Sequence, residues 1–174
     1  PEAKDNLINE GKNPDQIFFV GNTMIDSLVR FEKLFDEKEL LKMLKINDED
    51  YALFTIHRPS NVDNPEKYFE LLSSLNQISE RIHIVWTVHP RTKNLIKDNN
   101  FKLSENIFSI DPVGYFQFLG LQKNAQFIMT DSGGVQEEST YLGIPCFTLR
   151  DNTERPITIK YGTNNLVGTN FKKL

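Results

Sequence analysis

The segment Thr130–Glu138 carries the residue types of a phosphate-binding helix start. It reads Thr-Asp-Ser-Gly-Gly-Val-Gln-Glu-Glu and leads from an apolar run into a helical pattern. Gly133 and Gly134 allow close approach of the backbone to a ligand, and the free N–H groups of a first helical turn attract an anion. Glu138 lies deeper in the helix, where its carboxylate can accept hydrogen bonds from two ribose hydroxyls. The alternative is a plain helix start capped by Ser132, with solvated glutamates.

Histidine and arginine side chains follow two other apolar runs. His57 and Arg58 come directly after the run Tyr51–Ile56. An imidazole beside a guanidinium can pair with a pyrophosphate, and the histidine can protonate a leaving oxygen. A histidine bonded to a loop carbonyl, beside an arginine in a surface ion pair, explains the same dipeptide equally well. His89 also follows an apolar run. His57, His83 and His89 are the three histidines of the chain. Because no carboxylates converge with them in the sequence pattern, no metal site is predicted.

The segment Arg150–Pro156 adds two more arginines, Arg150 and Arg155, on either side of Glu154. Two interpretations are equally good: one of these arginines binds a phosphate, or the loop is held together by its own ion pairs. Phe118 belongs to an aromatic group with helical spacing, so it can stack on a base or belong to the core.

Composition excludes several classes of protein. The chain has 174 residues, of which 39% are hydrophobic and 25% charged, the values of an ordinary globular domain. A net charge of -4 leaves no basic surplus, so no nucleic-acid partner is expected. Cys146 is the single cysteine and cannot form an internal disulfide. The apolar runs are too short to span a bilayer and no leader opens the chain, which favours a cytoplasmic protein without a membrane partner.

Short apolar runs alternate with helical patterns along the chain. The predicted strands are Ile17–Val20, Tyr51–Ile56, Ile82–Val88, Ile107–Ile110, Gln126–Thr130, Cys146–Leu149 and Asn165–Val167. The predicted helices are Glu2–Glu10, Met24–Leu34, Pro65–Ile78, Thr92–Lys97, Tyr115–Lys123 and Gly134–Leu142, with Asp36–Asp50 as a linker. Near-continuous apolar strands with short connections predict an α/β fold, a Rossmann-like, doubly wound parallel sheet. Ligands of such sheets bind at the carboxyl ends of the strands, where the clusters above fall.

The motifs occur together in one known family. They are Gly21–Asp26, His57-Arg58, His89-Pro90, Asp131–Glu138, Thr153–Pro156 and Gly162–Thr169. In order and spacing the chain resembles the C-terminal half of the non-hydrolysing UDP-N-acetylglucosamine 2-epimerases over essentially its whole length. The resemblance implies one half of a glycosyltransferase-B-like two-domain fold. Residues 1–15 would be the tail of the N-terminal domain, which a chain opening on proline would lack, and residues 16–174 the C-terminal UDP-binding domain.

The resemblance also implies an activity. Family members interconvert UDP-GlcNAc and UDP-ManNAc, without NAD or metal, by eliminating UDP and adding it back after exchange of the C2 proton. The expected protein is therefore a cofactor-free isomerase of polysaccharide biosynthesis that binds a UDP-sugar, pairs with an N-terminal domain and forms a homodimer when intact. Because the carboxylates that move the C2 proton belong to the N-terminal half, this chain by itself is expected to be inactive.

Roles follow for individual residues by the same resemblance. His57 would contact and protonate the departing pyrophosphate, as the catalytic residue. The UDP-binding residues would be Arg58, Val113, Phe118, Ser132, Gly133, Gly134, Glu138 and Arg155. Among these, Ser132 to Gly134 and Arg155 would bind the phosphates. Glu138 would bind the ribose, and the Val113–Phe118 loop would contact the uracil. His89 matches a histidine that helps to bind an allosteric activator, a second UDP-GlcNAc, in bacterial members.

Two departures from the family pattern leave the exact activity open. Ser60 replaces a carboxylate found in many members, and the residues after His89 also differ from the common sequence. These changes weaken the activator assignment and leave room for an epimerase of a related UDP-2-acetamido-deoxy sugar. The pattern is also compatible with a UDP-sugar-dependent glycosyltransferase of the same architecture, with a module that senses UDP-sugars, and with a hydrolysing epimerase.

Overall fold

The computed structural model describes residues 2–46, 50–88, 92–94, 96 and 99–171. Within them lies a parallel sheet in the order β3-β2-β1-β4-β5-β6. The strands are β1 (Tyr51–Thr55), β2 (His83–Thr87), β3 (Ile107–Ile110), β4 (Phe127–Thr130), β5 (Cys146–Thr148) and β6 (Asn164–Leu166). The chain first builds β1, β2 and β3 outward in one direction and then returns to place β4 on the other side of β1. This reversal confirms the predicted Rossmann-like, doubly wound sheet.

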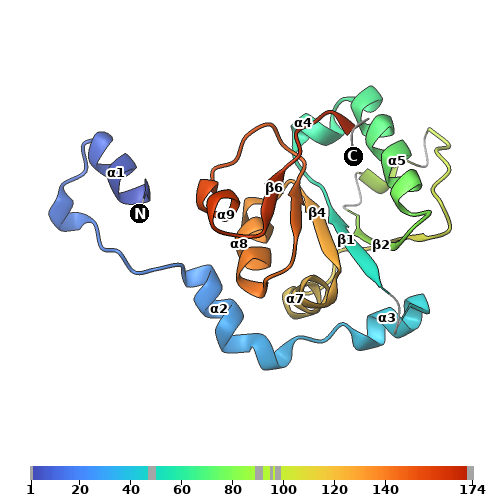
Figure 1. The fold of residues 1–174 in the computed structure, drawn as a ribbon, viewed down its shortest axis with the longest axis horizontal. Helices are drawn as coiled ribbons and strands as arrows, with labels where there is room; N and C mark the ends of the chain where they lie inside the picture. The colour runs from blue at the N-terminus through green and yellow to red at the C-terminus, as the bar shows by residue number, and fades with distance from the viewer. Residues whose placement is uncertain (1, 47–49, 89–91, 95, 97–98, 172–174) are drawn as a thin grey trace.

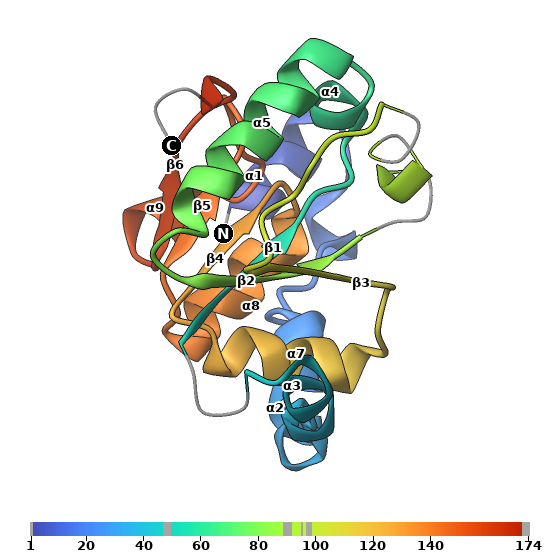
Figure 2. The same cartoon turned by 90° about the vertical axis from the view of Figure 1, so that its right-hand side faces the viewer.

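Helices pack on both faces of the sheet (Figures 1 and 2). The helices with described bounds are α1 (Glu2–Asn9), α2 (Thr23–Phe31), α3 (Lys38–Leu44), α4 (Pro59–Val62), α5 (Pro65–Ile78), α7 (Tyr115–Asn124), α8 (Gly133–Leu142) and α9 (Pro156–Lys160). Of these, α1 lies apart from the sheet (Figure 1). Two short 3-10 turns, Pro14–Gln16 and Glu32–Leu34, precede and follow α2. None of the helices in the described ranges is long and apolar enough to cross a membrane.

Alternate residues of β1 point into two separate cores. Phe54 packs with α4 and α5 on one face, its ring centroid 5.1 Å from that of Trp86. Leu53 packs with α3, α7 and α8 on the other face. Both β1 residues are fully buried, which is why the strand reads as a continuous apolar run rather than an alternating one.

Local signals placed the helix ends correctly. Asn64 caps α5 through its side chain, which accepts a hydrogen bond from the Lys67 backbone N–H at 3.2 Å, and Pro65 occupies the first helical position. Gly143 ends α8 in the left-handed conformation with φ of 75°. The predicted helix over 92–97 falls partly outside the described residues; 92–94 and 96 are helical.

Two predictions for the N-terminal part of the chain are wrong. The run Ile17–Val20 forms no strand: it crosses from α1 to α2 away from the sheet, and Phe18 and Phe19 are 78% and 77% exposed. An apolar run becomes a strand only beside a free sheet edge, and the sequence does not say where such an edge lies. The predicted linker Asp36–Asp50 contains α3, whose Leu41 is buried against the sheet.

Candidate functional site

The site lies where the strand order reverses. β1 and β4 are neighbours, with Thr55 opposite Thr130, so the segments that leave their carboxyl ends meet. His57 and Arg58 follow β1, while Asp131 and the start of α8 follow β4. Two of the clusters recognised in the sequence are thus brought together by strand pairing, at the place where doubly wound sheets bind ligands.

Asp131 is the centre of this junction, and its side chain is fully buried. It accepts hydrogen bonds from the backbone N–H of Arg58 at 2.8 Å, the backbone N–H of His57 at 3.2 Å and the side-chain amide of Asn61 at 3.0 Å. Burial raises the pKa of the carboxyl, but the hydrogen bonds from His57, Arg58 and Asn61 outweigh it and hold the pKa below its ordinary value. The sequence motifs assigned no role to this residue, although its place at a strand end was a signal.

His57 is oriented by Asp131. Its ring nitrogen Nδ1 lies 3.0 Å from Oδ1 of the carboxylate, and the side chain is 57% exposed. The hydrogen bond to Asp131 raises the pKa of His57, against the smaller opposing effects of partial burial and of Arg58. An imidazolium held by one nitrogen is suited to donate the proton of the other nitrogen to a ligand oxygen.

The start of α8 has no side-chain cap and lies close to Glu154. Ser132 occupies the N-cap without a side-chain capping hydrogen bond, so its hydroxyl is not used by the helix. A Cβ added to Gly133 would lie 2.6 Å from Oε1 of Glu154, which shows how closely that carboxylate approaches the helix. An anionic oxygen thus lies close to the end of the helix whose dipole favours negative charge.

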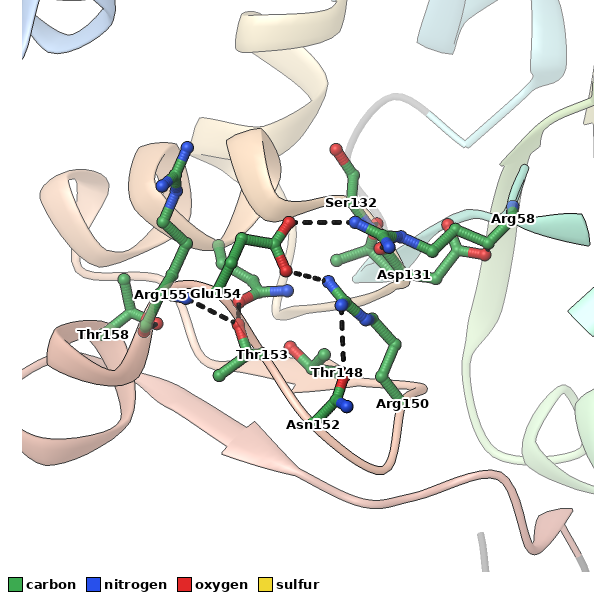
Figure 3. Close-up of polar contacts among 12 residues, drawn as sticks. Arg58, Asp131, Ser132, Thr148, Arg150, Asn152, Thr153, Glu154, Arg155 and Thr158 are labelled. Atoms are coloured by element: carbon green, nitrogen blue, oxygen red, sulfur yellow. Dashed lines mark hydrogen bonds and ion pairs between the residues drawn. The ribbon is translucent and has the colours of Figure 1, made fainter. Parts of the chain in front are cut away.

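Two arginines converge on Glu154 above this helix start (Figure 3). Nη2 of Arg58 lies 2.9 Å from Oε1, and Nη1 of Arg150 lies 2.5 Å from Oε2. Arg150 also donates to Oδ1 of Asn152 at 3.3 Å. Although burial raises the pKa of Glu154, its own backbone N–H and the two arginines lower it, so the carboxylate is ionised. One ion pair, Arg150 with Glu154, lies within the loop, and a second, Arg58 with Glu154, joins the loop to the segment after β1.

Arg155 does not join this group. Figure 3 shows its guanidinium directed away from Arg58 and Glu154. Its Nε lies 3.1 Å from Oε2 of Glu137, and the side chain lines a neighbouring cavity of about 960 Å³, bounded by α1, residues 17–24 and the start of α9. The role of Arg155 on a phosphate stays a prediction.

A buried polar network fixes the backbone of the loop. Oε1 of the fully buried Gln136 accepts hydrogen bonds from the Thr153 hydroxyl at 2.6 Å and from the Asn164 amide at 3.3 Å. Thr153 accepts from the backbone N–H of Arg155 at 3.0 Å, and Asn164 donates to the Thr158 hydroxyl at 3.2 Å. These residues hold Glu154 and Arg155 above α8, and no pattern in the sequence singled out Gln136 or Asn164 for that role.

Glu138 is placed by α7. The residue is 5% exposed, and its carboxylate accepts hydrogen bonds from the Gln122 amide at 2.7 Å and the Tyr115 hydroxyl at 3.1 Å. Burial raises its pKa, and the two hydrogen bonds oppose that effect. Val113 and Phe118 are half-buried and pack against the core on the α7 side of the sheet. The roles of these three residues toward ribose and uracil stay predictions.

The predicted activator residue His89 lies outside the described residues. In the described part of the chain, no group of three or more His, Cys, Asp or Glu side chains is placed to hold a metal ion.

Comparisons with known proteins place this geometry among nucleotide-sugar enzymes. A family model described as UDP-N-acetylglucosamine 2-epimerase matches residues 1–174. The enzyme of that name from Methanocaldococcus jannaschii is 45% identical, over 99% of this chain and 50% of its own length. Its crystal structure in complex with UDP-GlcNAc and UDP has a TM-score of 0.86, at 43% identity, and the match covers 98% of this chain and 49% of that one. A UDP-2,3-diacetamido-2,3-dideoxy-D-glucuronate 2-epimerase from Pseudomonas aeruginosa is 36% identical, over 95% of this chain and 46% of its own length.

The chain spans about half the length of the curated relatives it matches. Its sheet corresponds to one half of their glycosyltransferase-B-like fold, as the resemblance implied. Since the family model covers every residue and the fold agrees with that of solved members, the chain belongs to the UDP-N-acetylglucosamine 2-epimerase family.

Proposed function

We propose that this chain is the UDP-binding half of an enzyme that interconverts UDP-GlcNAc and UDP-ManNAc. The observation that carries the proposal is the meeting of the His57–Asp131 pair with Arg58 and with the start of α8, which has no side-chain cap. Such a site neutralises the charge of a diphosphate and can protonate it, which is what departure of UDP requires. The relative that was crystallised with UDP-GlcNAc and UDP supports the same ligand class.

The chemistry assigned to this half is stabilisation of the leaving group. As the C2 proton is removed, the C1–O bond breaks, its electron pair stays on the UDP oxygen, and a 2-acetamidoglucal remains. The imidazolium of His57 donates a hydrogen bond or a proton to that diphosphate. The carboxylate of Asp131 stabilises the charged ring until the proton is transferred. Ser132 and the N–H groups of Gly133 and Gly134 hold phosphate oxygens. In the return step the UDP oxygen bonds to C1 again, and C2 receives a proton on the face opposite to the one that lost it.

The nucleoside contacts extend along α8 and toward α7. Each carboxylate oxygen of Glu138 accepts one hydrogen bond from the protein, so a second lone pair on each remains for ribose hydroxyls. The segment Val113–Phe118 frames the uracil, and Arg155 approaches the phosphates from the cavity side.

The remaining assignments concern the intact enzyme. We assign the carboxylates that move the C2 proton to an N-terminal domain joined near residue 15, and a homodimer and a cytoplasmic location to the intact protein. His89 is assigned to an activating second UDP-GlcNAc.

A related UDP-2-acetamido-deoxy sugar is the second candidate substrate. The similarity to the Pseudomonas enzyme, whose name specifies a diacetamido sugar, favours it. The two candidates share UDP and differ in the sugar, so they make the same demands on this half of the enzyme.

Calorimetric titration of the 174-residue chain with UDP, with ADP as the control, tests the proposal. Saturable UDP binding with much weaker ADP binding is expected, since Glu138 and the uracil-facing loop read the nucleoside. Absence of UDP binding by a folded chain would refute a self-sufficient UDP site. Incubating the intact enzyme with each sugar nucleotide, without acceptor, then identifies the substrate and separates an epimerase from a glycosyltransferase.

A further inference from the structure

The carboxylate of Glu154 occupies a position that a diphosphate needs. It lies between Arg58 and Arg150, at distances of 2.9 and 2.5 Å, and close against Gly133 at the start of α8. Two guanidinium groups and a helix N-terminus are the groups that bind phosphate. A diphosphate that pairs with both guanidinium groups beside this helix start therefore displaces the carboxylate of Glu154 from them.

The charges favour that exchange. Arg58 and Arg150 together carry two positive charges, and the single carboxylate compensates one of them. The diphosphate of a UDP-sugar carries about two negative charges and can pair with both guanidinium groups. The side chain of Arg150 is only 11% exposed, so its guanidinium needs an anion whenever Glu154 leaves.

Glu154 can leave without disturbing the fold. Its side chain is 43% exposed and lies between β5 and α9, outside both elements. The backbone on either side is fixed separately, because Thr153 is bonded to Gln136 and to the N–H of Arg155. Rotation of the Glu154 side chain alone returns the carboxylate to water.

We propose that Glu154 is an internal competitor for the diphosphate of the UDP-sugar, and that Arg150 is a phosphate-binding residue besides those assigned above. The inference rests on the proposed function and adds to it the residue that sets the affinity. Arg58 and Arg150 exchange the carboxylate for the diphosphate on binding and recover it when UDP departs.

Glu154→Gln tests the competition, because the amide keeps the shape of the side chain and removes its charge. Glu32→Gln is the matched control, since Glu32 forms an exposed ion pair with Lys123 at 2.7 Å, outside the site. Calorimetric titrations with UDP, uridine and inorganic pyrophosphate compare both variants with the unmodified chain. UDP and pyrophosphate are expected to bind Glu154→Gln about two- to fivefold more tightly, the range of an exposed ion pair, with uridine unchanged. The control is expected to match the unmodified chain with all three ligands.

Arg150→Gln tests the role of the arginine. The variant is expected to bind UDP about tenfold or more weakly, since a charge-assisted contact to phosphate is lost, and its affinity for uridine is expected to be unchanged. If UDP binds the unmodified chain and binds Glu154→Gln equally or more weakly, Glu154 does not compete with the diphosphate. Its role is then to align the two arginines, and the proposed function is unaffected. An unchanged UDP affinity in Arg150→Gln refutes the role of that arginine. If UDP binds none of the folded chains, this half holds no self-sufficient UDP site, and the inference fails together with that part of the proposed function.

Discussion

Replacing Asp131 by asparagine tests the centre of the site. The change keeps the size of the side chain and removes the charge that holds His57. Oδ2 of Asp131 accepts from the backbone N–H of Arg58 at 2.8 Å and from the Asn61 amide at 3.0 Å, while Oδ1 faces the backbone N–H and the Nδ1 of His57 at 3.2 and 3.0 Å. An asparagine offers one oxygen and one NH₂ group. The backbone N–H of His57 lies 3.2 Å from Oδ2 as well and keeps an acceptor in either orientation. One orientation therefore leaves Nδ1 of His57 facing the NH₂ group, and the other leaves the Arg58 N–H and the Asn61 amide facing it.

The amide is expected to turn its NH₂ group toward His57. That side chain is 57% exposed and can replace a lost partner with water, whereas Asn61 is fully buried. What is lost is the charge-assisted contact between Asp131 and His57. A hydrogen bond to a charged group contributes about 1.5–3 kcal/mol, so we expect Asp131→Asn to lower the free energy of unfolding by about that amount at pH 7. An NH₂ group that faces Nδ1 also disfavours the imidazolium, and the pKa of His57 should fall below its value in the unmodified chain.

The pH dependence has a defined sign. The folded-state pKa of Asp131 is lowered, so its stabilisation is complete above the ordinary value of 3.8 and is lost as the pH falls through the lowered pKa. The pKa of His57 is raised, so its stabilisation is complete below 6.5 and is lost as the pH rises through the raised pKa. The difference in stability between the two chains should therefore shrink in acid.

Urea unfolding at several pH values measures the stability, and NMR titration of the histidine ring protons measures the pKa of His57. His83 serves as the internal reference, because it begins β2 at the amino end of the parallel sheet, whereas Asp131 follows the carboxyl end of β4. An unchanged pKa of His57 in a folded Asp131→Asn chain would refute the argument that the buried carboxylate controls the imidazole. Equal stabilities at pH 7 would refute the argument that the charge-assisted contact between Asp131 and His57 stabilises the fold.

Three further predictions concern binding, turnover and packing. Arg155→Ala should weaken UDP binding by about 1.5–3 kcal/mol in a calorimetric titration if that guanidinium reaches a phosphate, and an unchanged dissociation constant would exclude the contact. His57→Asn in the intact enzyme should lower kcat far more than it lowers UDP affinity; equal losses would reduce His57 to a ligand contact. Gly162→Ala should lower the free energy of unfolding by about 1–3 kcal/mol, because its Cβ would lie 2.6 Å from the backbone oxygen of Thr158. Gly114→Ala, whose nearest neighbour would be 3.9 Å away, is the control, and equal melting temperatures for the two variants would contradict the packing argument.

The sequence by itself determined the elements of the sheet and the general place of the site. Continuous apolar runs such as Tyr51–Ile56 favour strands covered on both faces, and the strands that formed are parallel. The Asn64-Pro65 pair and Gly143 marked helix ends, because capping depends on neighbours along the chain. The motif Asp131–Glu138 identified the family before any contact was known. All of these signals are local, so a pattern read along the chain contains them.

The tertiary structure alone decided which charged groups meet. Asp131 faces His57 across 74 positions of sequence because β4 returns to the side of β1, and no local pattern encodes that neighbour. Glu154 pairs with Arg58 across 96 positions, while the adjacent Arg155 turns to Glu137. The run Ile17–Val20 also depends on its neighbours in space: in the described part of the chain no sheet edge lies beside it, and it forms no strand. Charge pairing and strand pairing depend on distance in space, and the order of the strands sets that distance.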